Sequence, residues 1–220
     1  MKPIVIFGTG DIAELAHFYF LEDAERQVVA FTVDREYLGD GRFCGLPVIA
    51  FDEVTWAYPP DSYEMFVALS YSGLNQLRKA KFLAAQGLGY TLASYVSSRC
   101  TYLSKQPPGQ NCFILEDNTI QPFVAIGDNV TLWSGNHIGH HSSVGSHCFL
   151  ASHVVVSGGV SIGERCFIGV NATLRDHITV GENCVIGAAV TLLADAAPEG
   201  VYAATTAERS RVPSSRLKRI

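Results

Sequence analysis

Four of the chain's seven histidines lie within fourteen residues, in the segment GNHIGHHSSVGSHC at positions 135 to 148. Imidazole is a common metal ligand, and its titration near neutral pH also makes it the usual general base in acyl transfer. The cluster therefore indicates a metal site, a catalytic base among bystanders, or polar residues that fill turns. The choice depends on how the chain folds around His137, His140, His141 and His147.

An aliphatic residue recurs at every sixth position across the second half of the chain. This hexapeptide spacing is typical of a parallel β-helix, in which three hexads close one triangular coil. Successive coils stack at the strand spacing of about 4.8 Å, so residues three hexads apart become neighbours in a column. Fourteen successive positions fit: Ile114, Ile120, Ile126, Leu132, Ile138, Val144, Leu150, Val156, Ile162, Ile168, Leu174, Val180, Ile186 and Leu192.

The column rule predicts two inward ladders. Asn118 and Asn136 are three hexads apart and are expected to form a stacked amide ladder. Four of the six cysteines share another column, and we expect them to be small core residues rather than metal ligands or disulfides. These four are Cys112, Cys148, Cys166 and Cys184.

The same rule separates the histidines. His141, His147 and His153 are spaced by six and so lie at three different corners, while His141 and His177, two coils apart, are separated by roughly 10 Å. Histidines of one copy therefore do not converge on one metal ion. Ligands from neighbouring copies could do so, as in the γ-class carbonic anhydrases, and a zinc protein of that kind stays an alternative. We expect His147, His153 and His177 to occupy solvated turns, where they fill the turn or contact a neighbouring subunit.

His140 differs from the other histidines because its column neighbour one coil later is Gly158. An imidazole can take a proton from an attacking group, and a glycine can present an unobstructed N–H to the oxygen of a tetrahedral intermediate. The pair therefore predicts a general base stacked beside an oxyanion donor.

The first 95 residues predict a small α/β domain with parallel strands in KPIVIF, QVVAFTV and MFVALSY, and a helix in LNQLRKAKFLAAQG. Gly8 to Ala13 fits G-x-G-x-x-A, with a helix beginning near Asp11 that leaves free N–H groups for a phosphate. Asp34 follows the second strand, roughly where a ribose-binding acid sits relative to Gly10. A mononucleotide or nucleotide-sugar fits the short domain better than a dinucleotide; a purely structural turn stays open.

The composition indicates a soluble globular protein, with 48% apolar and 17% charged residues and a net charge of −5 without long runs of one sign. Scattered lysines and arginines do not suggest nucleic-acid binding. We find no secretory leader or membrane span and expect a cytoplasmic protein. The expected units are residues 1–95, a linker at 96–111, the β-helix at 112–197 and a tail at 198–220.

The chain resembles the bacterial nucleotide-sugar N- and O-acyltransferases, such as sialic acid O-acetyltransferases and the N-acetyltransferases of bacillosamine and perosamine precursors. IFGTGDIAE, VVAFTVD and FCGLPVIAFDEV are similar to the nucleotide-sugar domain, IGHHSSVG to the segment with the catalytic histidine, and VSGGVSIGERCFIGVNATL to the acetyl-CoA coils. The resemblance implies a Rossmann-like α/β domain, a left-handed parallel β-helix and a homotrimer.

The resemblance also implies the reaction. An acetyl group would pass from acetyl-CoA, without a metal, to the amino group of a nucleotide-linked amino-deoxy sugar for surface polysaccharide or lipopolysaccharide, by direct attack in a ternary complex. A sugar hydroxyl as acceptor and a non-catalytic trimeric scaffold are the alternatives. The implied residues are His140, His141 and Gly158 for catalysis; Gly158, Gly169, Val170, Asn171 and Ala188 for acetyl-CoA; and Gly8, Gly10, Asp11, Asp34, Asn75 and Arg78 for the nucleotide-sugar.

The sequence departs from the family at two places. The family commonly has an acid directly after the catalytic histidine to orient its ring, but this chain has His141, so either Asp117 or Glu116 takes that part or the base works less well. The family's G-x-P-A-K segment near the adenine is replaced by AATTAERS at positions 203 to 210.

Overall fold

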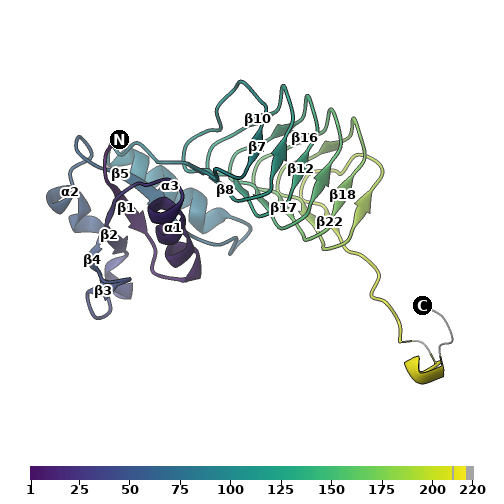
Figure 1. Cartoon of the computed structure of the whole chain (residues 1–220), viewed down its shortest axis with the longest axis horizontal. Coiled ribbons are helices and arrows are strands. Elements are labelled where there is room, and N and C mark those ends of the chain that lie inside the picture. Colours follow the sequence, from purple (N-terminus) through teal and green to yellow (C-terminus); the bar gives the residue numbers. More distant parts are fainter. Residues whose placement is uncertain (210, 217–220) are drawn as a thin grey trace.

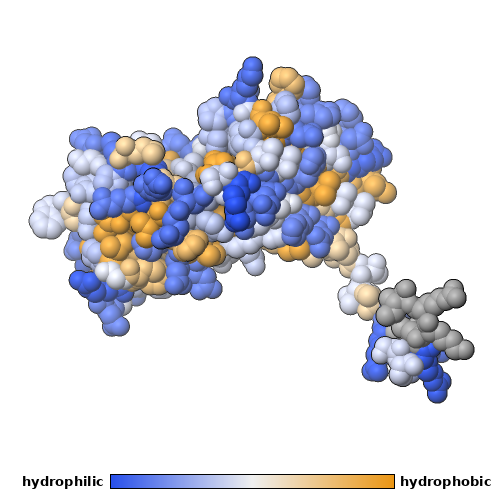
Figure 2. Space-filling view, viewed as in Figure 1, coloured by the Kyte–Doolittle hydropathy of each residue, from blue (hydrophilic) through white to orange (hydrophobic). Residues whose placement is uncertain are grey.

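The computed structural model describes residues 1–209 and 211–216, which form an N-terminal α/β domain, a three-sided β-helix and an extended C-terminal segment (Figure 1). Position 210 and positions 217–220 of the expected tail lie outside the described residues. No helix in the described ranges is long and apolar enough to cross a membrane. Figure 2 shows apolar residues scattered among polar ones on the visible face, with one apolar group on the N-terminal domain.

The N-terminal domain is built on a five-stranded sheet of order β3-β4-β2-β1-β5, parallel except for the β3–β4 pair. Its strands are β1 (Ile4–Phe7), β2 (Val28–Val33), β3 (Arg42–Phe43), β4 (Leu46–Ala50) and β5 (Glu64–Val67). Its helices are α1 (Asp11–Glu22), η1 (Arg35–Tyr37), η2 (Phe51–Glu53), α2 (Val54–Ala57) and α3 (Gln76–Gly87). The strands and helices expected from the apolar runs are therefore present.

The two faces of this sheet carry separate apolar cores. Phe20 of α1 packs with Phe31 and Phe66 on one face. Phe82 of α3 packs with Val5 and Met65 on the other. A helix on each side of a mainly parallel sheet is the arrangement that buries both faces of such strands. The domain is therefore a small Rossmann-like unit.

The β-helix has three faces, each a parallel sheet in which partners are three hexads apart, as in Leu132 with Leu150. The first face contains β6 (Tyr95–Val96), β8 (Phe113–Ile114), β11 (Thr131–Leu132), β14 (Phe149–Leu150), β17 (Phe167–Ile168), β20 (Val185–Ile186) and β22 (Val201–Tyr202). The second contains β7 (Thr101–Tyr102), β9 (Thr119–Ile120), β12 (His137–Ile138), β15 (Val155–Val156), β18 (Thr173–Leu174) and β21 (Thr191–Leu192). The third contains β10 (Ala125–Ile126), β13 (Ser143–Val144), β16 (Ser161–Ile162) and β19 (Thr179–Val180).

Strand pairing extends beyond the residues expected to form the β-helix. β6 pairs with β8, and β7 pairs with β9, so the range 96–111 contributes strands to the prism. At the other end β22, which follows residue 197, pairs with β20. Val96 of β6 keeps the six-residue spacing, but β7 and β22 have Tyr102 and Tyr202 in place of the aliphatic residue, so the ladder shows that these strands continue the coil.

The interior of the prism confirms the column rule. All fourteen repeating aliphatic residues belong to one core, together with Cys112, Cys148, Cys166 and Cys184. The buried amides form a ladder through the backbone: Asn118 Oδ1 accepts the N–H of Asn136 at 3.2 Å. Asn136 Oδ1 in turn accepts the N–H of Val154 at 2.8 Å.

The clustered histidines owe their positions to backbone conformation. His141, His147, His153 and His177 all have φ between 58° and 65°, in the left-handed region. They occupy the third place after the aliphatic residue, where each coil turns a corner. Asn, Asp and His are the side-chain-bearing residues that tolerate this region best. Turn geometry therefore explains two of the four clustered histidines, His141 and His147, without any ligand.

The structure corrects the expectation that His147 occupies a solvated turn, because this residue is only 5% exposed. The N-terminal domain covers it: the Phe82 ring lies 5.4 Å from the imidazole. Its Nδ1 lies 2.9 Å from the Asn129 amide nitrogen, and Asn129 Oδ1 accepts from Asn111 at 2.8 Å. Asn111 also donates to the Val67 carbonyl at 3.1 Å, so this second buried ladder joins the two domains.

Because Nδ1 of His147 faces an amide donor and the ring is buried, the folded protein favours neutral His147. Burial, and then the nearby Lys79, lower the pKa of His147 from its ordinary 6.5 to about 4. The unfolded chain therefore binds the proton first as pH falls. We predict that the stability linked to His147 is complete above about pH 6.5 and is lost as the pH falls toward about 4.

The matched variant is His147→Asn, which keeps a residue suited to the left-handed corner and an acceptor for Asn129. Melting temperatures across this pH window should fall less steeply for His147→Asn than for the wild type. His153→Asn, at an exposed corner, is the control and should keep the wild-type slope. Equal slopes for all three proteins would contradict the prediction.

Candidate active site

His140 lies on the edge between the second and third faces, with its imidazole exposed and resting on Gly158. A β-carbon on Gly158 would lie 2.7 Å from Cε1 and 2.8 Å from Nε2 of the ring, which is too close for any side chain. The main chain is held from both sides: the His140 N–H donates to Gln121 Oε1 at 2.8 Å, and the His140 carbonyl accepts the Gly159 N–H at 2.8 Å. The absence of a side chain at Gly158 therefore sets the position of the His140 ring.

The remaining ring nitrogen of His140 faces His141. The two Nδ1 atoms are 3.1 Å apart, so one proton lies between them and one ring donates to the other. Neither candidate acid orients His140 in the same copy, because Asp117 and Glu116 lie at the edge between the first and second faces. Glu116 is also engaged, accepting from Tyr19 at 2.8 Å and Ser134 at 2.7 Å.

Of the five residues expected to bind acetyl-CoA, Gly158 lies beside His140, and the other four lie on another edge, between the first and second faces. Val170, Asn171 and Ala188 are exposed there, and Gly169 is buried beneath them. A pocket of about 370 Å³ adjoins Ala188, and its lining includes Ala203 and Thr205 from the segment that departs from the family pattern. Within one copy, the second face of the prism separates this groove from His140.

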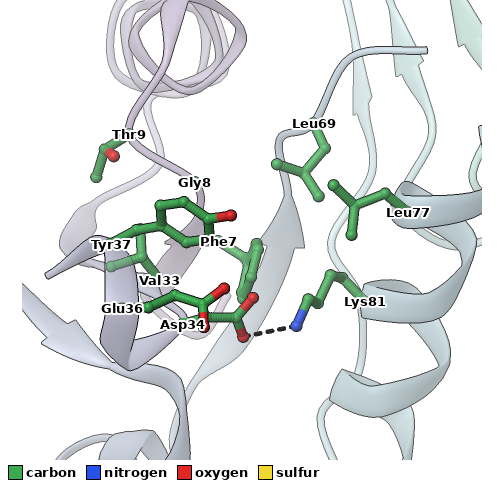
Figure 3. A pocket seen from close by; sticks show the side chains of 10 residues that line it. All are labelled: Phe7, Gly8, Thr9, Val33, Asp34, Glu36, Tyr37, Leu69, Leu77 and Lys81. Atoms are coloured by element: carbon green, nitrogen blue, oxygen red, sulfur yellow. Dashed lines mark hydrogen bonds and ion pairs between the residues drawn. The ribbon is translucent and has the colours of Figure 1, made fainter. Parts of the chain in front are cut away.

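The N-terminal domain contains a pocket of about 370 Å³ at the carboxyl ends of β1 and β2 (Figure 3). Leu69 and Leu77 line one side and Tyr37 the other, and Asp34 lies at one end of the pocket beside Lys81. The pocket is lined by Phe7, Gly8, Thr9, Val33, Asp34, Glu36, Tyr37, Leu69, Leu77 and Lys81. Clefts at the carboxyl ends of parallel strands are where such folds bind ligands.

Asp34 is held by an ion pair inside this pocket. Its Oδ1 lies 2.6 Å from Lys81 Nζ, and that ammonium lies 5.3 Å from the Phe7 ring centroid. Within residues 1–209 and 211–216, Asp34 Oδ2 has no hydrogen-bond partner, so it is free to accept a ligand hydroxyl. Sequence reasoning missed Lys81 because nothing in the apolar spacing of α3 marks it as facing Asp34.

Two of the expected nucleotide residues lie at the helix end rather than in the pocket lining. Gly10 precedes α1 and Asp11 begins it, and both are exposed. Asp11 and Glu14 also place negative charge in the first turn, which offsets the attraction of the helix dipole for an anion. Gly8, in contrast, lines the pocket with φ 118°.

The structure corrects the expectation that Asn75 and Arg78 bind the nucleotide-sugar. Both side chains instead join the two domains. Arg78 is 2% exposed and donates to Thr131 Oγ1 at 2.6 Å and to the Cys148 carbonyl at 3.1 Å. It also donates to Asn75 Oδ1 at 3.0 Å. Burial lowers the pKa of Arg78 to about 10. Both side chains are therefore structural.

The histidines do not assemble a metal site within one copy. In the part of the chain that the structure describes, no three His, Cys, Asp or Glu side chains are placed to hold one ion. His153 and His177 instead cover Gly135 and Gly159, whose added β-carbons would each lie 2.4 Å from an imidazole nitrogen.

Comparison with known families identifies the β-helix. Residues 126–158 match the family described as bacterial transferase hexapeptide (six repeats), and residues 159–194 match the hexapeptide repeat of succinyl-transferase. Residues 126–194 are therefore hexapeptide repeats of the kind described by these two models. No curated protein sequence matches the chain.

Solved structures match both domains together. The chain is similar to PerB from Caulobacter crescentus in complex with CoA and GDP-perosamine, with 24% identity and a TM-score of 0.79, over 91% of this chain and 93% of that one. It is also similar to the acetyltransferase domain of PglB from Neisseria gonorrhoeae, at 20% identity and a TM-score of 0.76 over 89% and 93% of the two chains. WeeI from Acinetobacter baumannii matches at 15% identity, with a TM-score of 0.75 over 91% and 96%.

These matches confirm the fold that the resemblance drawn from the sequence implied. The chain combines a Rossmann-like N-terminal domain with a left-handed parallel β-helix, as perosamine N-acetyltransferase does. Sequence identities of 15% to 24% establish a shared fold and nothing further.

Alanine substitutions at Gly8 and Gly10 test whether this glycine pair forms only a structural turn or also a phosphate-binding site. An alanine β-carbon at Gly8 would lie 2.8 Å from the Ala68 carbonyl oxygen at an unfavourable φ, so Gly8→Ala should lose roughly 1–3 kcal/mol of stability. Gly10 has φ −98°, and an added β-carbon meets no atom within 4 Å, so Gly10→Ala should melt like the wild type.

If Gly10 serves the approach of a phosphate, Gly10→Ala should weaken binding of UDP or GDP, whichever binds the wild type, by about tenfold. Isothermal titration calorimetry measures this directly. Unchanged affinity in a normally folded Gly10→Ala protein would make the glycine pair a structural turn.

Proposed function

We propose that the protein is an acetyl-CoA-dependent N-acetyltransferase whose acceptor is the amino group of a nucleotide-linked amino-deoxy sugar, a precursor of surface polysaccharide. The observation that carries the proposal is the exposed His140 imidazole resting on Gly158 within a β-helix of the transferase type. The relatives support the substrates, because PerB was solved with CoA and GDP-perosamine and the PglB domain with acetyl coenzyme A.

His140 is the proposed general base. Its Nε2 takes a proton from the acceptor amine as the amine nitrogen attacks the thioester carbonyl carbon, and the carbonyl oxygen becomes an oxyanion. The Gly158 N–H, which donates to no group of the described chain, stabilises that oxyanion. Collapse of the intermediate breaks the C–S bond, and the CoA sulfur receives the proton from the imidazolium.

The pocket at Asp34 is the proposed site of the nucleotide. Tyr37 and Leu69 provide apolar walls for the nucleobase. The free Oδ2 of Asp34 can accept a hydrogen bond from a ribose hydroxyl. The sugar of a nucleotide-sugar bound in this pocket must still reach the His140 imidazole, which is the proposed general base for the sugar amine.

The three parts of the proposed site lie far apart in one copy. The N-terminal domain packs on the first face, where Tyr71 contacts Phe149 and Phe167 at centroid distances of 5.0 and 4.8 Å. His140 lies between β12 of the second face and β13 of the third, on the edge opposite the first face. Each side of the coil is one hexad, or roughly 20 Å of chain. A complete site therefore requires neighbouring copies, and we propose the trimer implied by the family as the active form.

A mass-spectrometric screen tests the reaction. The protein is incubated with acetyl-CoA and GDP-, UDP- or dTDP-linked 3- and 4-amino sugars, and we expect an acetylated product with one of them. An amide product should survive mild alkali, whereas an ester on a hydroxyl should not. Acetylation of no amino sugar, or a product that alkali removes, would contradict N-acetyl transfer.

Replacing the base gives the residue-level prediction. His140→Ala should lower kcat by roughly 10²- to 10⁴-fold with an unchanged melting temperature. His153→Ala is the control, because its imidazole also covers a glycine at an exposed corner but lies on a different edge. Equal turnover by His140→Ala and the wild type would remove His140 from the mechanism.

A further inference from the structure

We propose that Phe123 is a positioning residue of this active site: through His141, it holds His140 in the tautomer that a general base needs. The inference rests on the proposed function of His140 as the base. It supplies a role for the aromatic side chain beside the His140–His141 pair, where no acid among the described residues of the same copy contacts the His140 ring.

The three rings form one contiguous stack on the edge between the second and third faces. Phe123 lies one coil before His141 in the same column, and their ring centroids are 4.6 Å apart with a tilt of 35°. The His141 ring then meets His140 edge to face, at 5.2 Å and 86°. His141 is therefore held between the phenyl ring and the base.

The tautomer follows from the contact between the two imidazoles. His140 can accept a substrate proton at Nε2 only if its own proton is on Nδ1. With the Nδ1 atoms 3.1 Å apart, that proton must be donated to the lone pair of His141 Nδ1. His141 can accept it only while its ring stays in the observed plane. Contact with Phe123 restricts rotation of that ring and so favours the active tautomer of His140.

The conformation of Phe123 is unusual for a residue whose only task is to fill a turn. Its φ is 66°, in the left-handed region, and its side chain is 68% exposed. Among the described residues with positive φ, no other is Phe, Tyr or Trp. In the same column, the coil after His141 has Gly159 at this corner, so a small residue fits there. The left-handed conformation is regular at these corners, but a bulky aromatic residue in it is uncommon, so the ring of Phe123 calls for a reason other than the turn.

The stack of Phe123 on His141 matters because an imidazole at position 141 is more demanding in its orientation than a carboxylate. A carboxylate would attract the Nδ1–H of His140 by charge and would tolerate a range of positions. A neutral imidazole offers one lone pair in one direction, so its orientation has to be fixed by packing. A carboxylate at position 141 should therefore make the phenyl ring dispensable, which gives the proposal its test.

The test is a double-mutant cycle on positions 123 and 141. Phe123→Gly removes the ring and relieves the backbone, because glycine is at ease with positive φ, and His141→Asp installs a carboxylate in a residue that tolerates the same corner. With His141 present, we expect Phe123→Gly to lower kcat by about tenfold at unchanged KM, as the competent tautomer becomes a minority. In the His141→Asp background, we expect Phe123→Gly to change kcat by less than about twofold.

One further variant and a check of folding complete the test. Phe123→Tyr keeps the ring and should retain the wild-type kcat. Melting temperature and oligomer size should match the wild type for every variant, so a fall in kcat cannot come from unfolding. An equal fall in kcat in both backgrounds would mean that Phe123 acts on the substrate or the fold, and no fall with His141 present would mean that it does not act at all. Either result overturns the proposal.

A measurement on the free protein separates this inference from the proposed reaction. Long-range ¹H–¹⁵N NMR of histidine-labelled protein reports which nitrogen of each neutral imidazole carries the proton, and His140→Ala assigns the signal. We expect the Nδ1–H tautomer for His140 in the wild type and a mixture in Phe123→Gly. Failure of every acetylation assay with this tautomer pattern would refute the reaction alone, whereas an Nε2–H tautomer in the wild type would refute the positioning role.

Discussion

The backbone ladder that joins each strand of the β-helix to the strand one coil later is the constraint on which the rest of the structure depends. It fixes which residue of one coil lies over which residue of the next, because a slip of one residue would turn every inward aliphatic side chain outward. The ladder therefore places the His140 ring on Gly158 and Phe123 beside His141. The chemistry of the site is a consequence of this register.

Features that follow from this periodicity could be predicted from the sequence. The inward cysteines, the separation of the histidines and the pairing of His140 with Gly158 all depend on spacing alone. Features that depend on contact between the domains could not be predicted. Arg78 was expected to contact a ligand, but it is buried and donates hydrogen bonds that join the two domains. The burial of His147 depends on Phe82, which belongs to the other domain. Phe123 was missed because a turn position in the repeat gives no indication of which ring it will contact.

The two domains are joined in a way that sets a limit on catalysis. Buried polar groups at the interface, including Arg78 and the Asn111–Asn129–His147 ladder, hold the N-terminal domain on the first face. Leaving such groups unpaired would be costly, so the domains are not expected to swing freely. The pocket at Asp34 therefore stays on the side of the prism away from His140 of the same copy.

Activity of mixed oligomers tests this account most directly. His140→Ala lacks the proposed base and Asp34→Ala lacks the proposed nucleotide contact, and each alone should have little activity. If the pocket and the base of one site come from different copies, random mixing of equal amounts should make about a quarter of the sites intact. We therefore predict that unfolding and refolding the two variants together restores about a quarter of the wild-type activity. No restoration in confirmed mixed oligomers would show that one copy supplies both parts, and would contradict the account.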